Sequence, residues 1–119
     1  MAKILLVEDD AAARDMVQHA LSNDGRTVTV AGDGQEVLDG RLAADVDIVV
    51  SDISMPSVAG ITLAETLIAL NPNLPIVLMS AIADELNRAQ NIGGGKVRVI
   101  GKPVTLDKLK SEISGLLSA

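Results

Sequence analysis

The most regular feature of this chain is an alternation between short apolar runs and longer segments in which apolar residues recur every three or four positions. Runs of four to six residues rich in Val, Ile and Leu are typical of β-strands. The predicted strands cover residues 3–8, 27–31, 47–51, 75–80 and 97–100. A helix-type segment follows each of them, so the pattern predicts five strand–helix units in succession.

The five helix-type segments differ in the strength of their pattern. Residues 11–23, 58–71 and 105–117 each place apolar residues on one face, whereas residues 33–44 form a weaker predicted helix and residues 82–92 the weakest. The three apolar faces should pack against the sheet. Their members are Ala13, Met16, Val17, Ala20 and Leu21 in the first helix, Ile61, Ala64, Leu67 and Ile68 in the third, and Leu106, Leu109, Ile113 and Leu116 in the fifth.

This succession of strands and helices predicts an α/β fold with a parallel sheet covered by helices on both faces. The first, third and fourth strands are continuously apolar, as strands buried on both faces should be, whereas the second and fifth alternate as edge strands do. Three central and two edge strands fit the order 2-1-3-4-5, a doubly wound sheet of the flavodoxin-like class with five helices. Ligands of such sheets bind beyond the carboxyl ends of the strands, where the chain reverses direction between strands one and three.

The residues with the most chemical potential gather where the predicted strands end. Glu8 and Asp9 stand at the end of the first strand, Asp52 follows the third, Ser80 ends the fourth and Lys102 follows the fifth. Asp52 comes almost directly after an apolar run, where a buried carboxylate is costly unless it is compensated. Because parallel strands end at the same edge of a sheet, we expect these five side chains to lie close together.

Carboxylates packed together need a raised pKa, a cation, or both. Like charges about 4 Å apart repel by roughly 4 kcal/mol at an effective dielectric constant near 20. A set of oxygen ligands without His or Cys favours Mg²⁺ or a similar hard ion. With Lys102 as a mobile positive charge and Ser80 as a hydrogen-bond donor, these are the parts of a phosphoryl-transfer site.

The composition excludes several other classes of protein. The chain has 119 residues, enough for one domain of common size, and 48% of them are apolar although Phe, Tyr, Trp and Cys are absent. There is thus no disulfide framework and no cysteine zinc site. The net charge of −6 and the lack of a basic cluster argue against a nucleic-acid surface. The first apolar run has only four residues before three acids, so we expect no signal peptide and a cytoplasmic protein.

Four sequence blocks together resemble the response-regulator receiver domains. "ILLVEDDAAAR", "DISMPSVAG", "IVLMSA" and "GKP" occur in the order and at the spacing of that family. The resemblance runs from end to end and implies a single receiver domain over residues 1–119 of the stand-alone type. Some alphaproteobacterial single-domain receivers, including those that control cell-cycle proteolysis, share this general look.

The resemblance also implies a role for each acid. Asp52 would be the phosphoacceptor. Asp9 would bind Mg²⁺ directly, Glu8 largely through water, and Asp52 and the main-chain carbonyl of Ser54 would complete the ligand set. The buried strand would then end in a carboxylate because that carboxylate is a nucleophile beside a metal.

Further roles follow from the two later blocks. Ser80 would be the switch hydroxyl, Lys102 the phosphoryl-binding lysine, and the peptide bond between Lys102 and Pro103 would be cis. The sequence departs from the family where Phe or Tyr often stands three residues before the lysine and Phe after "KP", because Val99 and Val104 occupy those places. We therefore expect no aromatic ring to report the state of the switch.

The resemblance implies two-component signal transduction rather than catalysis on another molecule. Asp52 would receive a phosphoryl group from a histidine kinase or a histidine phosphotransfer protein, with slow self-dephosphorylation, and the signal would pass to an unknown protein by phosphorylation-dependent binding or by phosphorelay. The alternative is a protein-binding adaptor that needs no phosphate. A haloacid-dehalogenase-type enzyme would need a second Asp where Ser54 stands, and an FMN phosphate would be repelled by "EDDAAA".

Some polar residues have simpler interpretations. Asp10 should start the first helix rather than bind a metal, and Thr105 should be the N-cap of the last. His19 and Arg14 should be solvated on helix surfaces. The segment 82–95, which ends in three glycines, should be a short or partly disordered helix that Ser80 reshapes on phosphorylation.

Overall fold

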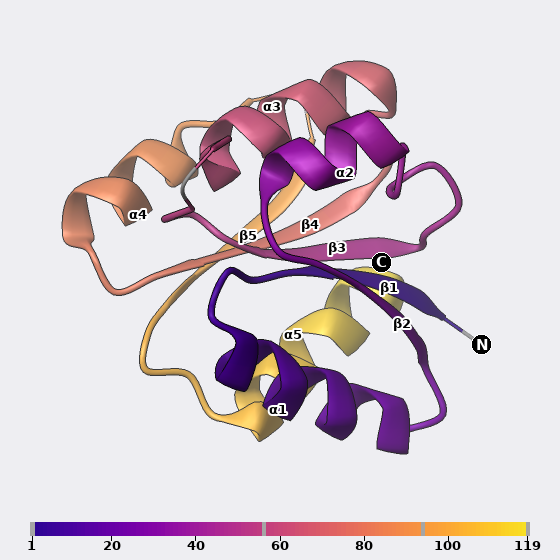
Figure 1. Ribbon diagram of the computed structural model, residues 1–119. Coiled ribbons are helices and arrows are strands. Elements are labelled where there is room, and N and C mark those ends of the chain that lie inside the picture. Colours follow the sequence, from indigo (N-terminus) through magenta and orange to yellow (C-terminus); the bar gives the residue numbers. More distant parts are fainter. Residues whose placement is uncertain (1, 56, 94, 119) are drawn as a thin grey trace.

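Five parallel strands form one sheet in the order β2-β1-β3-β4-β5, as the sequence predicts (Figure 1). The computed structural model describes residues 2–55, 57–93 and 95–118, so Pro56 and Gly94 of the motifs above lie outside the described residues. The strands are β1 (Lys3–Val7), β2 (Thr27–Ala31), β3 (Ile48–Asp52), β4 (Pro75–Ser80) and β5 (Lys96–Gly101).

The helices lie on both faces of this sheet (Figure 1). One face carries α2 (Gly34–Gly40), α3 (Gly60–Leu70) and α4 (Ala83–Gln90), and the other carries α1 (Ala11–Asn23) and α5 (Leu106–Ser118). None of the helices in the described part of the chain combines the length and the hydropathy that a membrane-spanning segment requires.

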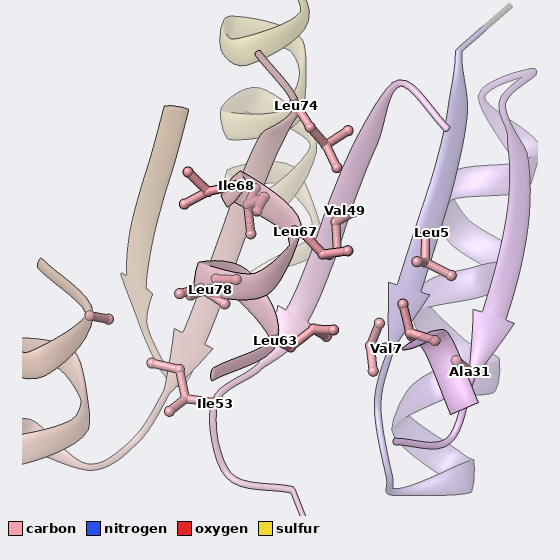
Figure 2. Packing of buried hydrophobic residues seen from close by; sticks show 14 residues of the cluster. Leu5, Val7, Ala31, Val49, Ile53, Leu63, Leu67, Ile68, Leu74 and Leu78 are labelled. Carbon is pink, nitrogen blue, oxygen red and sulfur yellow. The ribbon is translucent and has the colours of Figure 1, made fainter. Parts of the chain in front are cut away.

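The burial of the strands confirms their predicted places. β3 is buried along its whole length and β1 along all but its first residue, whereas the edge strands β2 and β5 alternate between exposed and covered positions. The sheet therefore has an apolar layer on each face. One layer lies between the sheet and helices α2, α3 and α4 and includes Leu63, Leu67 and Leu78 (Figure 2). The other layer lies between the sheet and helices α1 and α5.

Several predicted boundaries and faces were wrong. α2 ends at Gly40 instead of residue 44, because Arg41 takes a left-handed conformation at φ 50° and turns the chain. β3 extends one residue further than predicted and includes Asp52. Met16 does not join the buried face of α1, since it is 58% exposed, and Leu63 belongs to the buried face of α3 although the spacing did not assign it.

Helix starts agree better with the sequence. The side chain of Asp10 accepts hydrogen bonds from the main-chain N–H groups of Ala12 and Ala13 at the start of α1, as predicted. Thr105 likewise accepts a hydrogen bond from Lys108 N–H at the start of α5. The weakest predicted helix, α4, is present but has only eight residues.

Gly60 joins the end of β3 to α3 at very short range. Its main-chain N–H donates to the carbonyl oxygen of Ile53 at 2.8 Å. A Cβ atom here would collide with the carbonyl oxygen of Asp52 and lie 2.7 Å from the Cα of Ile53. Both neighbours are backbone atoms at a buried strand end, so they cannot move aside cheaply. Only glycine allows this approach.

We therefore expect Gly60→Ala to destabilise the protein by more than about 2 kcal/mol, because the added methyl group forces the backbone at Asp52 to shift. Urea unfolding followed by far-UV circular dichroism measures the change. Gly115→Ala is the matched control: nothing lies within 4 Å of a Cβ at that helical position, so it should stabilise by about 0.5–1 kcal/mol. Equal stability of the two variants would contradict the close approach.

Candidate functional site

The two buried carboxylates of the site are fixed by the sheet itself. Asp52 is the last residue of β3 and is 6% exposed; Glu8 directly follows β1 and is 7% exposed. The N–H of Glu8 donates to the carbonyl of Ala31 in β2, and the N–H of Ile53 donates to the carbonyl of Met79 in β4. Both acids are thus held on either side of the point where the strand order reverses.

Asp9 joins these two acids from the exposed side. One carboxylate oxygen from each of Glu8, Asp9 and Asp52 lies within 4.8 Å of the others. Burial, followed by the hydrogen bond and charge of Asp52, raises the pKa of Glu8 to about 8, although the Lys102 charge opposes the shift. Without a bound cation, the cluster therefore relieves part of its repulsion by keeping a proton on Glu8.

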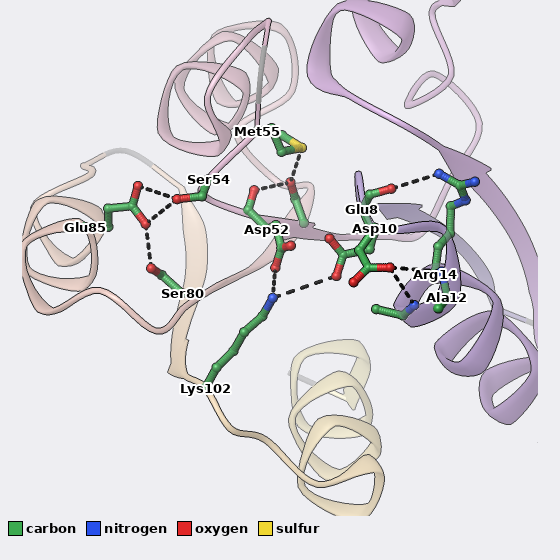
Figure 3. Close-up of polar contacts among 12 residues, drawn as sticks. Glu8, Asp10, Ala12, Arg14, Asp52, Ser54, Met55, Ser80, Glu85 and Lys102 are labelled. Atoms are coloured by element: carbon green, nitrogen blue, oxygen red, sulfur yellow. Dashed lines mark hydrogen bonds and ion pairs between the residues drawn. The ribbon is translucent and has the colours of Figure 1, made fainter.

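Lys102 supplies the positive charge of the site (Figure 3). Its Nζ lies 2.6 Å from Oδ1 of Asp52 and 3.7 Å from Oε1 of Glu8. The contact with Asp52 is a short ion pair that offsets the charge of the buried carboxylate. Burial lowers the pKa of Lys102, but the neighbouring carboxylates outweigh this effect and raise it.

The backbone delivers Lys102 to this place. Its N–H donates to the carbonyl of Ser80 at 2.8 Å, which joins the end of β5 to the end of β4. The peptide bond between Lys102 and Pro103 is cis, the geometry that the family resemblance implies.

Ser80 lies on the far side of Asp52 and is bound to a residue that the sequence reasoning missed. Its hydroxyl donates to Oε1 of Glu85 at 2.6 Å and accepts from the N–H of Ile82 at 2.9 Å. The Ser54 hydroxyl lies 2.9 and 2.8 Å from the two oxygens of the same Glu85 carboxylate (Figure 3). The Ser80 hydrogen bond, followed by that of Ser54, lowers the pKa of Glu85. The only feature of the sequence that could have drawn attention to Glu85 is its position as an acid in the first turn of a weakly predicted helix.

Arg14 also has a role that was not predicted. It was expected to be solvated, but its guanidinium donates to the main-chain carbonyl of Glu8 at 3.1 Å and is partly buried (Figure 3). This contact stabilises the turn that carries Glu8 and Asp9 into α1. His19 is exposed on the surface of α1, as expected.

The arrangement of the acidic side chains fits a hard divalent cation. The donor set consists only of oxygens, and three carboxylates, two of them buried, converge. Ser54 lines one shallow pocket with Asp9 and Glu85, and a second with Asp52, Ser80 and Lys102. The predicted site residues are therefore brought together at one edge of the sheet.

Comparison with known proteins agrees with this geometry. The family model for the response regulator receiver domain matches residues 4–114. Response regulator MprA of Mycolicibacterium vanbaalenii is 32% identical over 97% of this chain and 50% of its own length. The C4-dicarboxylate transport transcriptional regulatory protein DctD of Rhizobium meliloti is 35% identical over 89% of this chain and 23% of its own length.

Solved structures show the same fold. The receiver domain of the Francisella response regulator 1452 superposes with a TM-score of 0.86 at 27% identity, covering 99% of this chain and 98% of that one. The present chain spans about half the length of MprA, so the match concerns the receiver part of that relative. From the family model over residues 4–114, the shared fold and the acidic strand-end site, we conclude that the chain belongs to the response regulator receiver domains of two-component systems.

Proposed function

We propose that Asp52 accepts a phosphoryl group from a histidine kinase or a histidine phosphotransfer protein and that this modification is the signal. One observation carries the proposal: Asp52 is buried at a strand end, where Lys102 Nζ lies 2.6 Å from Oδ1 and two more carboxylates converge. A carboxylate that merely ended a strand would not need this surrounding charge.

The transfer forms one bond and breaks one. A carboxylate oxygen of Asp52 attacks the phosphorus of the donor, an acyl phosphate forms, and the bond from phosphorus to the donor nitrogen breaks. The electron pair of that bond leaves with the imidazole, which takes up a proton. Lys102 is close enough to Asp52 to stabilise negative charge on a phosphoryl oxygen.

Asp9, Asp52 and the carbonyl of Ser54 would hold Mg²⁺, with Glu8 bound through water. When bound, this ion neutralises the carboxylates and binds phosphoryl oxygens. Ser80 lines the same pocket as Asp52 and Lys102 and would donate its hydroxyl hydrogen to the phosphoryl group. The role of the chain's own residues is thus to position a nucleophile and to balance charge.

The proposed protein is a signalling switch and not an enzyme acting on other substrates, apart from slow hydrolysis of its own acyl phosphate. It would pass the signal to another protein by binding or by phosphorelay, as a stand-alone regulator without a nucleic-acid surface. Its net charge of −6 supports the absence of a nucleic-acid surface.

An adaptor that works without phosphate is the second candidate function. Whether the protein acts alone is tested by measuring the mass of the natural protein in its source cell.

Asp52→Asn should abolish phosphorylation, because an amide oxygen is a poor nucleophile. Incubation with acetyl phosphate and Mg²⁺ should add one phosphoryl group to the wild-type protein, measured by intact-protein mass spectrometry. Asp45→Asn, at an exposed position outside the site, should be labelled like the wild type. Undiminished labelling of Asp52→Asn would overturn the assignment, and no labelling of any form would favour the adaptor.

Asp9→Ala should remove most of the Mg²⁺-dependent rise in melting temperature. A ligand that binds only the folded state adds about 2.7 kcal/mol at a hundredfold excess over its Kd. Without Mg²⁺ the variant should melt above the wild type, since one repelling charge has gone. Thermal unfolding followed by circular dichroism measures both effects. Asp15→Ala, exposed on α1, should respond to Mg²⁺ as the wild type does; an unchanged response in Asp9→Ala would count against the site.

The metal-free protein should lose stability as the pH rises from about 4.5 to about 8. In this window folded Glu8 keeps a proton that the unfolded chain releases, so the folded state binds more protons and its advantage shrinks as the pH rises. The loss is up to about 5 kcal/mol. The loss of stability is measured as the fall in the midpoint urea concentration of unfolding between these pH values, in the presence of a chelator.

Glu8→Gln should flatten this pH dependence, because an amide does not titrate. Glu65→Gln, an exposed position on α3, should keep it. A slope in Glu8→Gln equal to that of the wild type would show that another group is responsible.

A further inference from the structure

The only hydrogen that the Ser80 hydroxyl can donate is already used in the structure, and both partners of this hydroxyl lie at the start of α4. It donates its only hydrogen to Oε1 of Glu85 at 2.6 Å, and it accepts from the N–H of Ile82 at 2.9 Å. A hydroxyl has one hydrogen to donate. Ser80 therefore cannot donate to a phosphoryl group on Asp52 while it donates to Glu85.

Glu85 holds a second hydroxyl at the same time. Ser54, two residues after Asp52, lies 2.8 Å from one Glu85 oxygen and 2.9 Å from the other (Figure 3). We call these contacts of Ser54 and Ser80 with the carboxylate of Glu85 the Glu85 bridge. It ties the first turn of α4 to the ends of both β3 and β4.

The bridge also completes the N-terminus of α4. Ile82 is the N-cap residue, and its own side chain makes no capping hydrogen bond. Its N–H is satisfied by Ser80, whose hydroxyl in turn donates to Glu85 in the first turn of the helix. Of the two bonds of a capping box, the one from the N-cap N–H to the acidic side chain at the third helical position is thus relayed through a serine, and the other is absent. If Ser80 moves away, Ile82 loses its acceptor and Glu85 loses a donor.

We propose that the Glu85 bridge opposes phosphorylation by holding Ser80 in the resting position, and that its rupture transmits the signal to α4. Glu85 is a positioning residue in this scheme, since it acts through Ser80. The inference rests on the proposed function of Asp52. Because coupling between sites is reciprocal, whatever stabilises Ser80 on Glu85 must weaken the binding of a phosphoryl group by the same factor.

The test is a titration with beryllofluoride and Mg²⁺, a mimic of the phosphoryl group, with bound fluoride followed by ¹⁹F nuclear magnetic resonance. Glu85→Ala should lower the beryllofluoride concentration for half occupancy by about tenfold, since a hydrogen bond to a charged group is worth about that factor in an equilibrium constant. Asp84→Ala, the exposed neighbour in the same first turn, removes an equal charge without breaking the bridge and should change it by less than about twofold.

Two further variants separate the bridge from simple charge repulsion. Glu85→Gln keeps an acceptor oxygen, so its shift should be smaller than that of Glu85→Ala. In a Ser80→Ala background, Glu85→Ala should have no effect, because the residue through which it acts is gone. Equal shifts for the two Glu85 variants, or a full effect in the Ser80→Ala background, would overturn the bridge. So would an unchanged affinity in Glu85→Ala.

Hydrogen exchange provides a second test. If Ser80 only capped α4, the binding of beryllofluoride would leave the exchange of that helix unchanged. Beryllofluoride should reduce the protection of residues 82–90 in the wild type and leave it unchanged in Ser80→Ala. Identical exchange of this segment in the free and bound wild type would contradict the transmission to α4.

Failure of the bridge can be told from failure of the proposed function with Asp52→Asn. If the wild type binds beryllofluoride, Asp52→Asn does not, and the Glu85 variants behave like the wild type, only the bridge is wrong. If Asp52→Asn binds as well as the wild type, the phosphoacceptor assignment is wrong and the bridge is refuted with it.

Discussion

The carboxylates of Glu8 and Asp52 are buried at the end of an apolar sheet, and their repulsion is the interaction on which the rest of the site depends. Lys102 is held against both of them, and Glu8 keeps a proton at neutral pH. Each of these responses offsets negative charge that the parallel strands bring together. The repulsion that remains favours the binding of a cation, because a positive charge at this place would be attracted by all three carboxylates.

Much of the fold could be predicted because its signals are local. Continuous apolar runs and alternating runs distinguished central from edge strands, and strand ends then brought Glu8, Asp52 and Lys102 together. Errors arose where a single residue decides the backbone, as Arg41 does by ending α2. Glu85 was missed because it binds serines that follow two different strands, and Arg14 was missed because it binds a main-chain carbonyl. Neither kind of contact leaves a periodic pattern in the sequence.

Receivers with an aromatic residue near the lysine have a ring whose position can change with the switch. Here Val99 is a stiff, β-branched residue on an edge strand, and the chain contains no Phe, Tyr or Trp. Without such a ring, the hydroxyl groups of Ser54 and Ser80 connect the site to α4 through hydrogen bonds. Ser80 and Ser54 both end on one carboxylate of α4, which gives this receiver a polar route from the site to the surface.

The close approach of Gly60 to the end of β3 makes the two sides of the site mechanically unequal. On the α3 side, the backbone of Gly60 approaches the backbone of Asp52 and Ile53 so closely that a side-chain atom would not fit between them. On the α4 side, the connection consists of side-chain hydrogen bonds to an eight-residue helix. The connection of Asp52 to α3 is therefore more rigid than its connection to α4. If Asp52 is phosphorylated as proposed, we expect the resulting displacement to favour α4 over α3.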